Sequence, residues 1–309
     1  MISQKLTIVI FLYITALYPY ILYPINKSID FMKLIMLELL KAKFKYGYNG
    51  QLYCNGFNDN SVNDFNDNDS IDIIIANHPN SFYDIMLIIL ILNKYNINNY
   101  NFICSEFVPK IPGLNLLLKL YNNIIIKQNY SKDYQTIING LDKIIKSKNK
   151  EFIIIFPEGD VLTSKEAKKN SQRFSKENNL PILNNVLVPK AKGLFTIVEY
   201  LKKHNKLGTI HDFTVHKKIN DYYIDIKQFE PKYDNYEMFK KQLYSVWFDK
   251  EKLIDKMNEG KYKAPKVFLR SKQMVFLLLI FIIVLQTILL CNSKYLIFFI
   301  CYVTYFYYS

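Results

Sequence analysis

The sequence predicts a single layered α/β domain, with a mixed sheet flanked by helices, and membrane segments at both ends of the chain. Short apolar runs typical of buried strands recur between residues 71 and 228, and amphipathic helical stretches lie between them. Long uncharged stretches near both termini predict the membrane segments. We therefore divide the 309 residues into an N-terminal anchor with an interfacial helix at 1–48, a folded domain at 49–265 and membrane segments at 266–309.

The N-terminal apolar stretch, from Leu6 to Ile25, carries no charge over 20 positions, which is about the length that a helix needs to cross a bilayer. Pro19 and Pro24 also allow a kinked or re-entrant segment. A cleaved signal peptide is the alternative, but only one lysine precedes the apolar run and no small-residue cleavage site follows it. The run therefore predicts an anchor.

At the other end of the chain, residues 274–291 form an apolar run of 18 residues, interrupted only by Gln286 and Thr287. The segment 295–308 is short for a full span and rich in aromatic residues, which fits a position at the membrane interface. Residues 28–45, with charges at helical spacings, predict an interfacial helix.

Basic residues cluster after the N-terminal apolar region and before the C-terminal one, so both clusters flank the central region. The positive-inside bias therefore predicts that the central region faces the cytosol. The net charge of +13 suits an anionic partner such as a phospholipid surface or a phosphorylated substrate. Nucleic acid is a poorer match, because the basic residues gather beside apolar segments and not in a stripe with stacking aromatics. No metal is expected: the four cysteines form no CxxC pair, and the Asn- and Asp-rich segment 58–70 lacks the glycine and glutamate of a calcium loop.

The central region reads as strands alternating with helices. The predicted strands are 71–76, 101–105, 123–127, 151–156, 209–217 and 222–228, and the predicted helices are 133–146, 165–179 and 193–203. Ser131 or Asp133 is available as the cap of the first of these helices. The alternation implies a sheet with helices packed against it.

Two groups of polar residues follow predicted strands, where α/β folds place active sites. After the strand 71–76, His78 is followed six positions later by Asp84, and a loop with a first helical turn can bring the carboxylate back to the imidazole. Such a pair can take a proton from a hydroxyl. The alternative is a turn histidine before a helix whose first turn contains Asp84, and the local sequence does not favour either. After the strand 151–156, Gly159 allows a tight turn that would present Glu158 at the end of the sheet.

Together these groups resemble the signatures of the glycerolipid acyltransferase superfamily, which contains glycerol-3-phosphate and 1-acylglycerol-3-phosphate acyltransferases. The first signature, N-H-x4-D, is similar to Asn77-His78 with Asp84, and the third, F-P-E-G-T, to residues 156–159. The second is similar to Val108–Gly113 with Ile124–Lys127, and the fourth to Val186–Gly193. Further matches, at Thr163, Ser171, Phe174, Leu180, Pro181, Leu183 and the block 243–253, resemble the branch that holds lysocardiolipin acyltransferases.

The chain departs from the family pattern at three places. His78 and Asp84 are one position further apart than usual, although an H-x-N-x-F-x-D form is familiar in some members. Asp160 replaces the usual threonine, and Lys127 and Lys190 stand where the family usually has arginine. A lysine replaces the bidentate grip of arginine on phosphate by a point charge.

The resemblance implies an acyltransferase domain at 49–265 that moves a fatty acyl group from acyl-CoA to a hydroxyl of a lysophospholipid, with 1-acylglycerol-3-phosphate as the first candidate. In that scheme His78 accepts the hydroxyl proton, Asp84 holds the imidazole, Glu158 with Gly159 orients the acceptor, and Lys127 and Lys190 contact its phosphate. No bound cofactor is implied, since acyl-CoA is a co-substrate. The partners are then a bilayer, the lysophospholipid and acyl-CoA, and the expected location is a membrane facing the cytosol, with the endoplasmic reticulum as the family's common address.

Two other functions stay open from the sequence. One is a phospholipid transacylase that works without CoA. The other is a catalytically silent, membrane-anchored lipid-binding or scaffold protein of the same fold.

Overall fold

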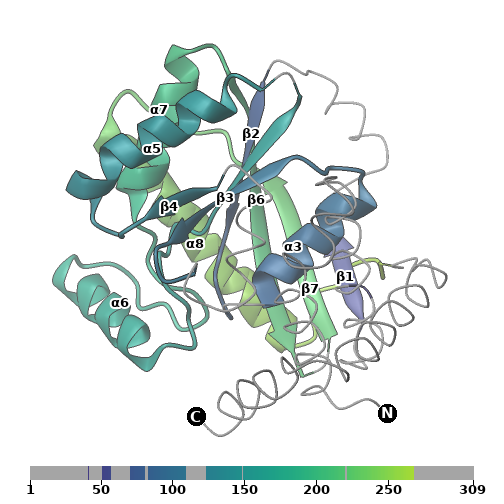
Figure 1. Ribbon diagram of the computed structural model, residues 1–309. Helices are drawn as coiled ribbons and strands as arrows, with labels where there is room; N and C mark the ends of the chain where they lie inside the picture. The colour runs from purple at the N-terminus through teal and green to yellow at the C-terminus, as the bar shows by residue number, and fades with distance from the viewer. Residues whose placement is uncertain are drawn as a thin grey trace, which may run out of the picture. The chain divides into compact units, whose positions relative to one another are not determined.

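A seven-stranded mixed sheet organises the part of the chain that the structure describes (Figure 1). This structure is a computed structural model, and it describes residues 41, 51–56, 70–80, 83–108, 123–147, 149–219 and 221–267. All the strands and helices named below belong to one compact unit of the chain.

The strands are β1 (Leu52–Asn55), β2 (Ile71–Ala76), β3 (Tyr100–Ser105), β4 (Ile124–Ile126), β5 (Glu151–Ile155), β6 (Leu207–Lys218) and β7 (Asp221–Gln228). The helices are α3 (Tyr83–Lys94), α5 (Tyr130–Ile144), α6 (Lys165–Glu177), α7 (Ala191–Lys203) and α8 (Tyr236–Asn258).

The strand order is β1-β7-β6-β2-β5-β3-β4. The strands β6, β2, β5, β3 and β4 run parallel to one another, β7 is antiparallel to β6, and β1 is parallel to β7. In the register of β2 with β5, Ile75 lies opposite Ile155. The carboxyl ends of these two central strands are therefore level, and the loops that follow them begin side by side.

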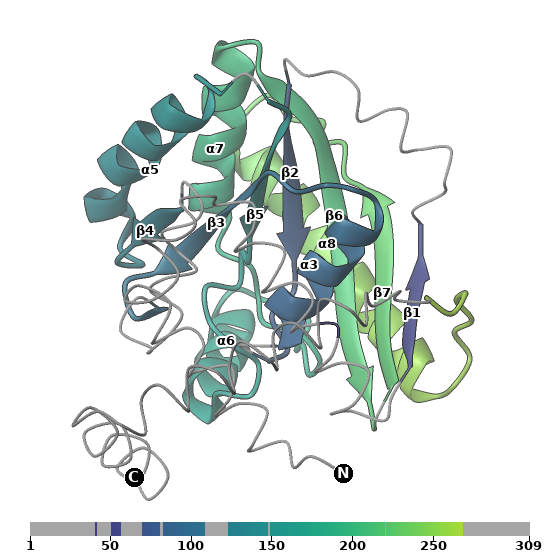
Figure 2. The ribbon, with the colours of Figure 1, turned by 45° about the vertical axis from the view of Figure 1, so that its right-hand side comes forward.

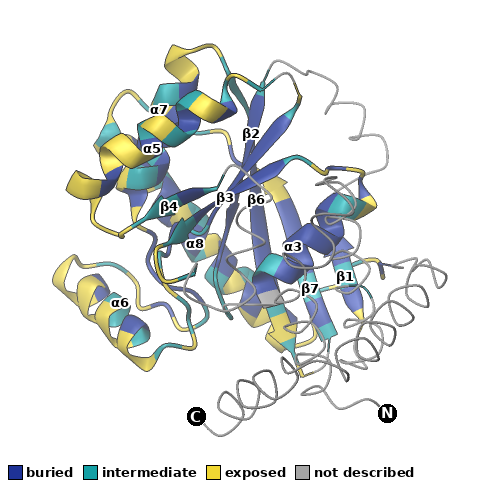
Figure 3. Cartoon of the chain, viewed as in Figure 1, coloured by how far each residue is buried: buried dark blue, intermediate teal, exposed yellow. Residues whose placement is uncertain are grey.

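Continuous apolar sequence explains the central strands. Every residue of β2 and β5 is buried, as expected for parallel strands covered on both faces. Figure 3 shows β2 in the dark blue of buried residues. Alternate residues of these strands, such as Ile73 and Ile153, share one apolar core with α5, α7 and α8. Helix α3 lies against the opposite face of the sheet, as the two views in Figures 1 and 2 agree.

All six predicted strands and all three predicted helices are present, with bounds shifted by a few residues. The sheet is mixed, as predicted, because of the antiparallel pair β6 and β7. Neither β1 nor α8 was among the predicted elements. The predicted caps of α5 are wrong: the N-cap is Asn129, whose side chain accepts from the N–H of Lys132, while Asp133 accepts N–H groups of the preceding turn.

Several predictions fall outside the described residues. These are the apolar stretches at 6–25, 274–291 and 295–308, nearly all of the helix at 28–45 and of the segment 58–70, and most of the motif at 108–113. Among the residues that the structure describes, no helix has both the length and the apolar character required to cross a membrane.

The first strand and the last described residues are neighbours. The N–H of Cys54 donates to the carbonyl of Pro265 at 3.0 Å, and the N–H of Val267 donates to the carbonyl of Leu52 at 2.7 Å. The segment 265–267 thus pairs with β1, which is an edge strand of the sheet.

Candidate active site

Asn77 fixes the point at which the chain leaves β2. Its buried side chain donates from Nδ2 to the carbonyl of Val215 at 2.9 Å and accepts at Oδ1 from the N–H of Val215 at 2.7 Å. The amide thereby continues the pairing of β2 with β6 for one more residue, because it offers the donor and acceptor that a strand backbone would offer. The next residue, His78, starts from a fixed position.

His78 and Asp84 are in direct contact. Nδ1 of the imidazole lies 2.7 Å from Oδ2 of Asp84, which is in the first turn of α3. The same oxygen accepts from the N–H of Asn80 at 2.8 Å, so one carboxyl group orients the ring and holds the loop that precedes the helix. Burial raises the pKa of Asp84. With Nδ1 engaged, Nε2 is the ring nitrogen left to exchange a proton with another molecule.

The loop after β5 holds His78 through further contacts. The ring of Phe156 stacks on the imidazole, with 4.2 Å between centroids and 24° between planes. The carbonyl of His78 accepts from the N–H of Leu162 at 2.9 Å, and the N–H of His78 donates to Oε2 of Glu158 at 3.2 Å. The His78 side chain keeps 15% of its surface exposed, whereas that of Asp84 keeps only 2%.

Glu158 faces the protein interior, not solvent. It is 2% exposed, and its other oxygen, Oε1, accepts from Nε1 of Trp247 in α8 at 3.0 Å. Burial raises the pKa of Glu158 to about 8, and the hydrogen bonds from Trp247 and His78 only partly offset this effect. Both carboxyl oxygens therefore have protein donors, an arrangement that differs from the expected contact with an acceptor hydroxyl.

Gly159 and Lys190 lie together at the rim of this loop. Gly159 has a φ of +68°, which favours glycine, and a β-carbon there would lie 3.0 Å from Nζ of Lys190. The N–H of Lys190 donates to the carbonyl of Pro157 at 2.7 Å, just before α7 begins. The exposed ammonium of Lys190 is thus held over the turn that contains Glu158.

Lys127 is exposed at the end of β4, in the turn that leads into α5. Its neighbour Gln128 donates from Nε2 to the carbonyl of Gly159 at 2.5 Å. The turn after β4 therefore contacts the turn after β5. Of the predicted site residues, His78, Asp84 and Glu158 are linked by hydrogen bonds, and Lys190 lies over Gly159. Lys127 is adjacent in sequence to Gln128, which makes the contact with Gly159.

Trp247 and Lys250 of α8 were missing from the predicted site. Lys250 is buried, pairs with Asp212 of β6, donates to the carbonyl of Phe213 at 2.7 Å, and lies 4.9 Å from the centroid of the Trp247 ring. Burial lowers the pKa of Lys250. A signal was present: the buried residues Leu243, Trp247, Lys250, Ile254 and Met257 follow a helical spacing that places the lysine in an otherwise apolar stripe.

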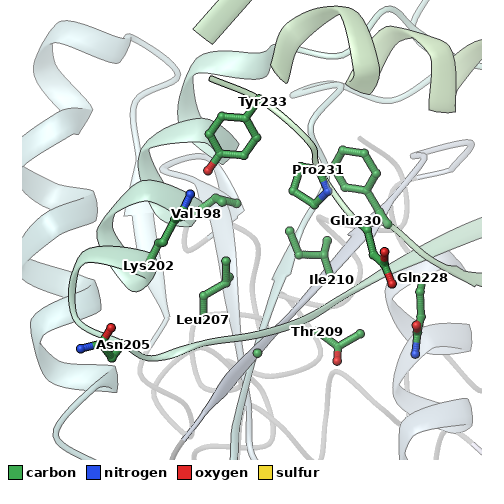
Figure 4. Close-up of a pocket in the computed structure, with 12 residues that line it drawn as sticks. Val198, Lys202, Asn205, Leu207, Thr209, Ile210, Gln228, Glu230, Pro231 and Tyr233 are labelled. Carbon is green, nitrogen blue, oxygen red and sulfur yellow. The ribbon is translucent and has the colours of Figure 1, made fainter. Parts of the chain in front are cut away.

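A hollow of about 620 Å³ lies at the opposite end of the sheet (Figure 4). It is lined by the start of β6, including Leu207 and Ile210, and by the segment after β7 that contains Tyr233. Because β6 runs parallel to β2, its first residues are at the amino edge, away from His78. This hollow is not part of the candidate active site.

Comparisons with known proteins point to one family. A family model described as Acyltransferase matches residues 65–215, a segment that contains His78, Asp84, Lys127, Glu158 and Lys190 but not α8. The chain is 27% identical over 143 residues to a probable 1-acyl-sn-glycerol-3-phosphate acyltransferase 5 from Arabidopsis thaliana, covering 46% of this chain and 37% of that protein.

Two further relatives have similar coverage. The chain is 31% identical over 144 residues to lysocardiolipin acyltransferase 1 from Gallus gallus, covering 46% of this chain and 38% of the relative. It is 28% identical over 107 residues to acyl-CoA:lysophosphatidylglycerol acyltransferase 1 from Homo sapiens, covering 34% and 28%. The matched segments thus span well under half the length of each relative.

Proposed function

This chain belongs to the glycerolipid acyltransferase superfamily, whose family model matches residues 65–215, and on that premise we propose that it transfers a fatty acyl group from acyl-CoA to a hydroxyl of a lysophospholipid. The first candidate acceptor is 1-acylglycerol-3-phosphate. The observation that carries the proposal is the 2.7 Å contact of His78 Nδ1 with Asp84, at the carboxyl end of a buried parallel strand.

In the proposed reaction, Nε2 of His78 accepts the proton of the acceptor hydroxyl as its oxygen attacks the thioester carbonyl carbon. The carbon–sulfur bond breaks, and CoA leaves as a thiol after His78 returns the proton to sulfur. Asp84 keeps the ring oriented and stabilises its charged form. A base of this kind contributes about 10² to 10⁴-fold to the rate. The two substrates supply the nucleophile and the acyl group, so we propose no bound cofactor and no metal.

The exposed lysines at the same edge are suited to the acceptor's phosphate. Lys190 has its ammonium over the turn at Gly159, and Lys127 lies in the turn that Gln128 connects to Gly159. Each provides a point charge, and lysine is a common phosphate ligand. Gly159 belongs to this site because its φ of +68° favours glycine and a β-carbon there would lie 3.0 Å from the ammonium of Lys190.

Because the acceptor and the product are lipids, we propose that the segments 1–48 and 266–309 keep the domain at a membrane surface with the site facing the cytosol. The endoplasmic reticulum is the first membrane to examine. The net charge of +13 favours anionic headgroups and the phosphates of CoA.

The test is the release of free CoA by the full-length protein in membranes. The acceptors are lysophosphatidic acid, lysophosphatidylglycerol, lysocardiolipin and glycerol 3-phosphate, each given with acyl-CoA. We expect His78→Ala to lower the rate with the preferred acceptor by about 10²-fold or more. His204→Ala is the matched control, because this exposed histidine at the end of α7 bonds only locally, to the carbonyl of Tyr200 at 2.8 Å.

Equal rates for wild type and His78→Ala would contradict the proposal. Acylated product formed from a lysolipid and a phospholipid without acyl-CoA would instead favour the transacylase. Absence of product under both conditions would favour a lipid-binding or scaffold role.

A further inference from the structure

We infer that Trp247 of α8 is a positioning residue for His78 and acts through Glu158. The inference rests on the proposed role of His78 as the base. Two hydrogen bonds connect the three residues: the N–H of His78 donates to Oε2 of Glu158 at 3.2 Å, and Nε1 of Trp247 donates to Oε1 at 3.0 Å. Trp247 lies outside the segment that the family model matches.

The carboxyl group of Glu158 is buried and has three N–H donors: the indole of Trp247 and the backbones of His78 and Leu187. A buried polar group without a partner destabilises the fold, whereas a fully paired one has a single preferred orientation. If the indole N–H is removed, Oε1 loses the hydrogen bond from Trp247, and the carboxyl group is held only by the backbone N–H groups of His78 and Leu187. The hydrogen bond from the backbone N–H of His78 to Oε2 is then less well oriented, although the His78 side chain has not changed.

Trp247 is itself fixed in place. Its side chain is fully buried in the core formed by α8, and the ammonium of Lys250 lies 4.9 Å from the ring centroid. Lys250 is in turn held by Asp212 and by the carbonyl of Phe213, both in β6. The helix is thereby tied to the strand that flanks β2, so the indole presents its N–H to Glu158 from a rigid support.

Bulk alone does not account for this tryptophan. An apolar ring of the same size would fill the core equally well, but it would leave the carboxyl group of Glu158 without one donor. The prediction therefore concerns the N–H group and not the packing of the ring.

The chain contains a single tryptophan, so an analogue can be introduced at this position alone. We would replace Trp247 by benzothienylalanine, which keeps the bicyclic shape and has sulfur in place of N–H. Trp247→Phe is the simpler variant. The packing control is Phe239→Leu, a buried α8 residue that contacts Phe195, Phe229 and Tyr233 and not Glu158.

The measurements are kcat, KM for acyl-CoA and KM for the acceptor, together with the melting temperature. We expect the analogue to lower kcat roughly tenfold or more, as for the loss of a hydrogen bond to a buried acidic group. Both KM values should stay within about twofold, since neither residue is placed against a substrate. Phe239→Leu should lower the melting temperature and leave kcat within about twofold.

A double-mutant cycle that combines the Trp247 analogue with Glu158→Gln tests whether Trp247 acts on His78 through Glu158. If Trp247 acts through Glu158, the double variant has the kcat of Glu158→Gln alone, so the two effects are not additive. Unchanged kcat in the analogue, additive effects, or an equal loss of kcat in Phe239→Leu would overturn the inference. Failure of the proposed function is distinguishable, because His78→Ala would then retain wild-type activity.

Discussion

At the scale of single residues, Asp84 has two roles: it orients the imidazole of His78 and it holds the loop before α3. Its Oδ2 lies 2.7 Å from the imidazole and accepts the N–H of Asn80 at 2.8 Å, so the ring and the loop share one acceptor. His78 and Asp84 are six positions apart, one more than the usual family spacing. The helix begins at Tyr83, and its first turn still brings the carboxyl group to the ring.

Asp84→Asn is expected to lower kcat by about 10² to 10⁴-fold, because an amide accepts at only one atom and cannot stabilise a charged imidazole. Stability should not fall in proportion, since burial raises the pKa of Asp84 and thus disfavours its charged form. The measurement is kcat alongside the melting temperature. Asp234→Asn, at an exposed position before α8, is the control. If Asp84→Asn retained the wild-type kcat, the pair would be structural only.

At the scale of elements, the turn between β4 and α5 is built around Asp133. Its buried carboxylate accepts from the N–H of Lys127 at Oδ1 and from the N–H of Asn129 at Oδ2, both at 2.7 Å. Gln128 between them has a φ of +60°, which an unsupported turn would rarely adopt. The start of the helix therefore fixes the position of Lys127.

Asp133→Ala leaves two N–H groups of this turn without an acceptor. We expect the free energy of unfolding to fall by about 1–3 kcal/mol. The KM for the phosphate-bearing acceptor should rise about tenfold, as for the loss of one charged contact, while kcat changes little. Lys143→Ala, exposed in the last turn of the same helix, should leave both quantities unchanged. An unaltered KM in Asp133→Ala would remove Lys127 from the proposed phosphate site.

The strands and helices predicted from the sequence are those marked by a pattern within a short stretch of residues. Continuous apolar runs mark β2 and β5, and the spacing of His78 and Asp84 allows their contact, although the local sequence did not favour it over a turn histidine. Strand β1 has four residues of mixed character, LYCN, and lacks the continuous apolar run that marks even the three residues of β4. The partner of Glu158 in α8 is 89 residues away, and no local periodicity identifies such a pair.

At the scale of the whole molecule, the two edges of the parallel strands have different chemistry. The amino edge holds Asp72, which is buried and bonded to Lys150 at 2.8 Å and to His211 at 3.1 Å, and these partners lower its pKa against the effect of burial. At the carboxyl edge, burial dominates and raises the pKa of Glu158. Stability is therefore favoured by a charged carboxylate at one edge and by a neutral carboxyl group at the other.

This difference predicts how the free energy of unfolding depends on pH. The pKa of Glu158 is raised from its usual 4.5 to about 8, so the folded state binds a proton that the unfolded state has released. The stabilisation from this group is complete below pH 4.5 and is lost as the pH rises through about 8. Within that window the expected slope is about 1.4 kcal/mol per pH unit.

Glu158→Gln removes this titration, although its amide leaves at least one of the N–H donors from His78, Trp247 and Leu187 facing another donor and therefore lowers stability at every pH. The measurement is urea unfolding of the full-length wild type and the variant at pH 5, 6, 7 and 8. We expect the wild type to lose its advantage over the variant steadily across this range. A constant difference would mean that Glu158 is ionised throughout. A neutral Glu158 at pH 7 can still accept both N–H groups, so its connection between His78 and α8 does not require a charge.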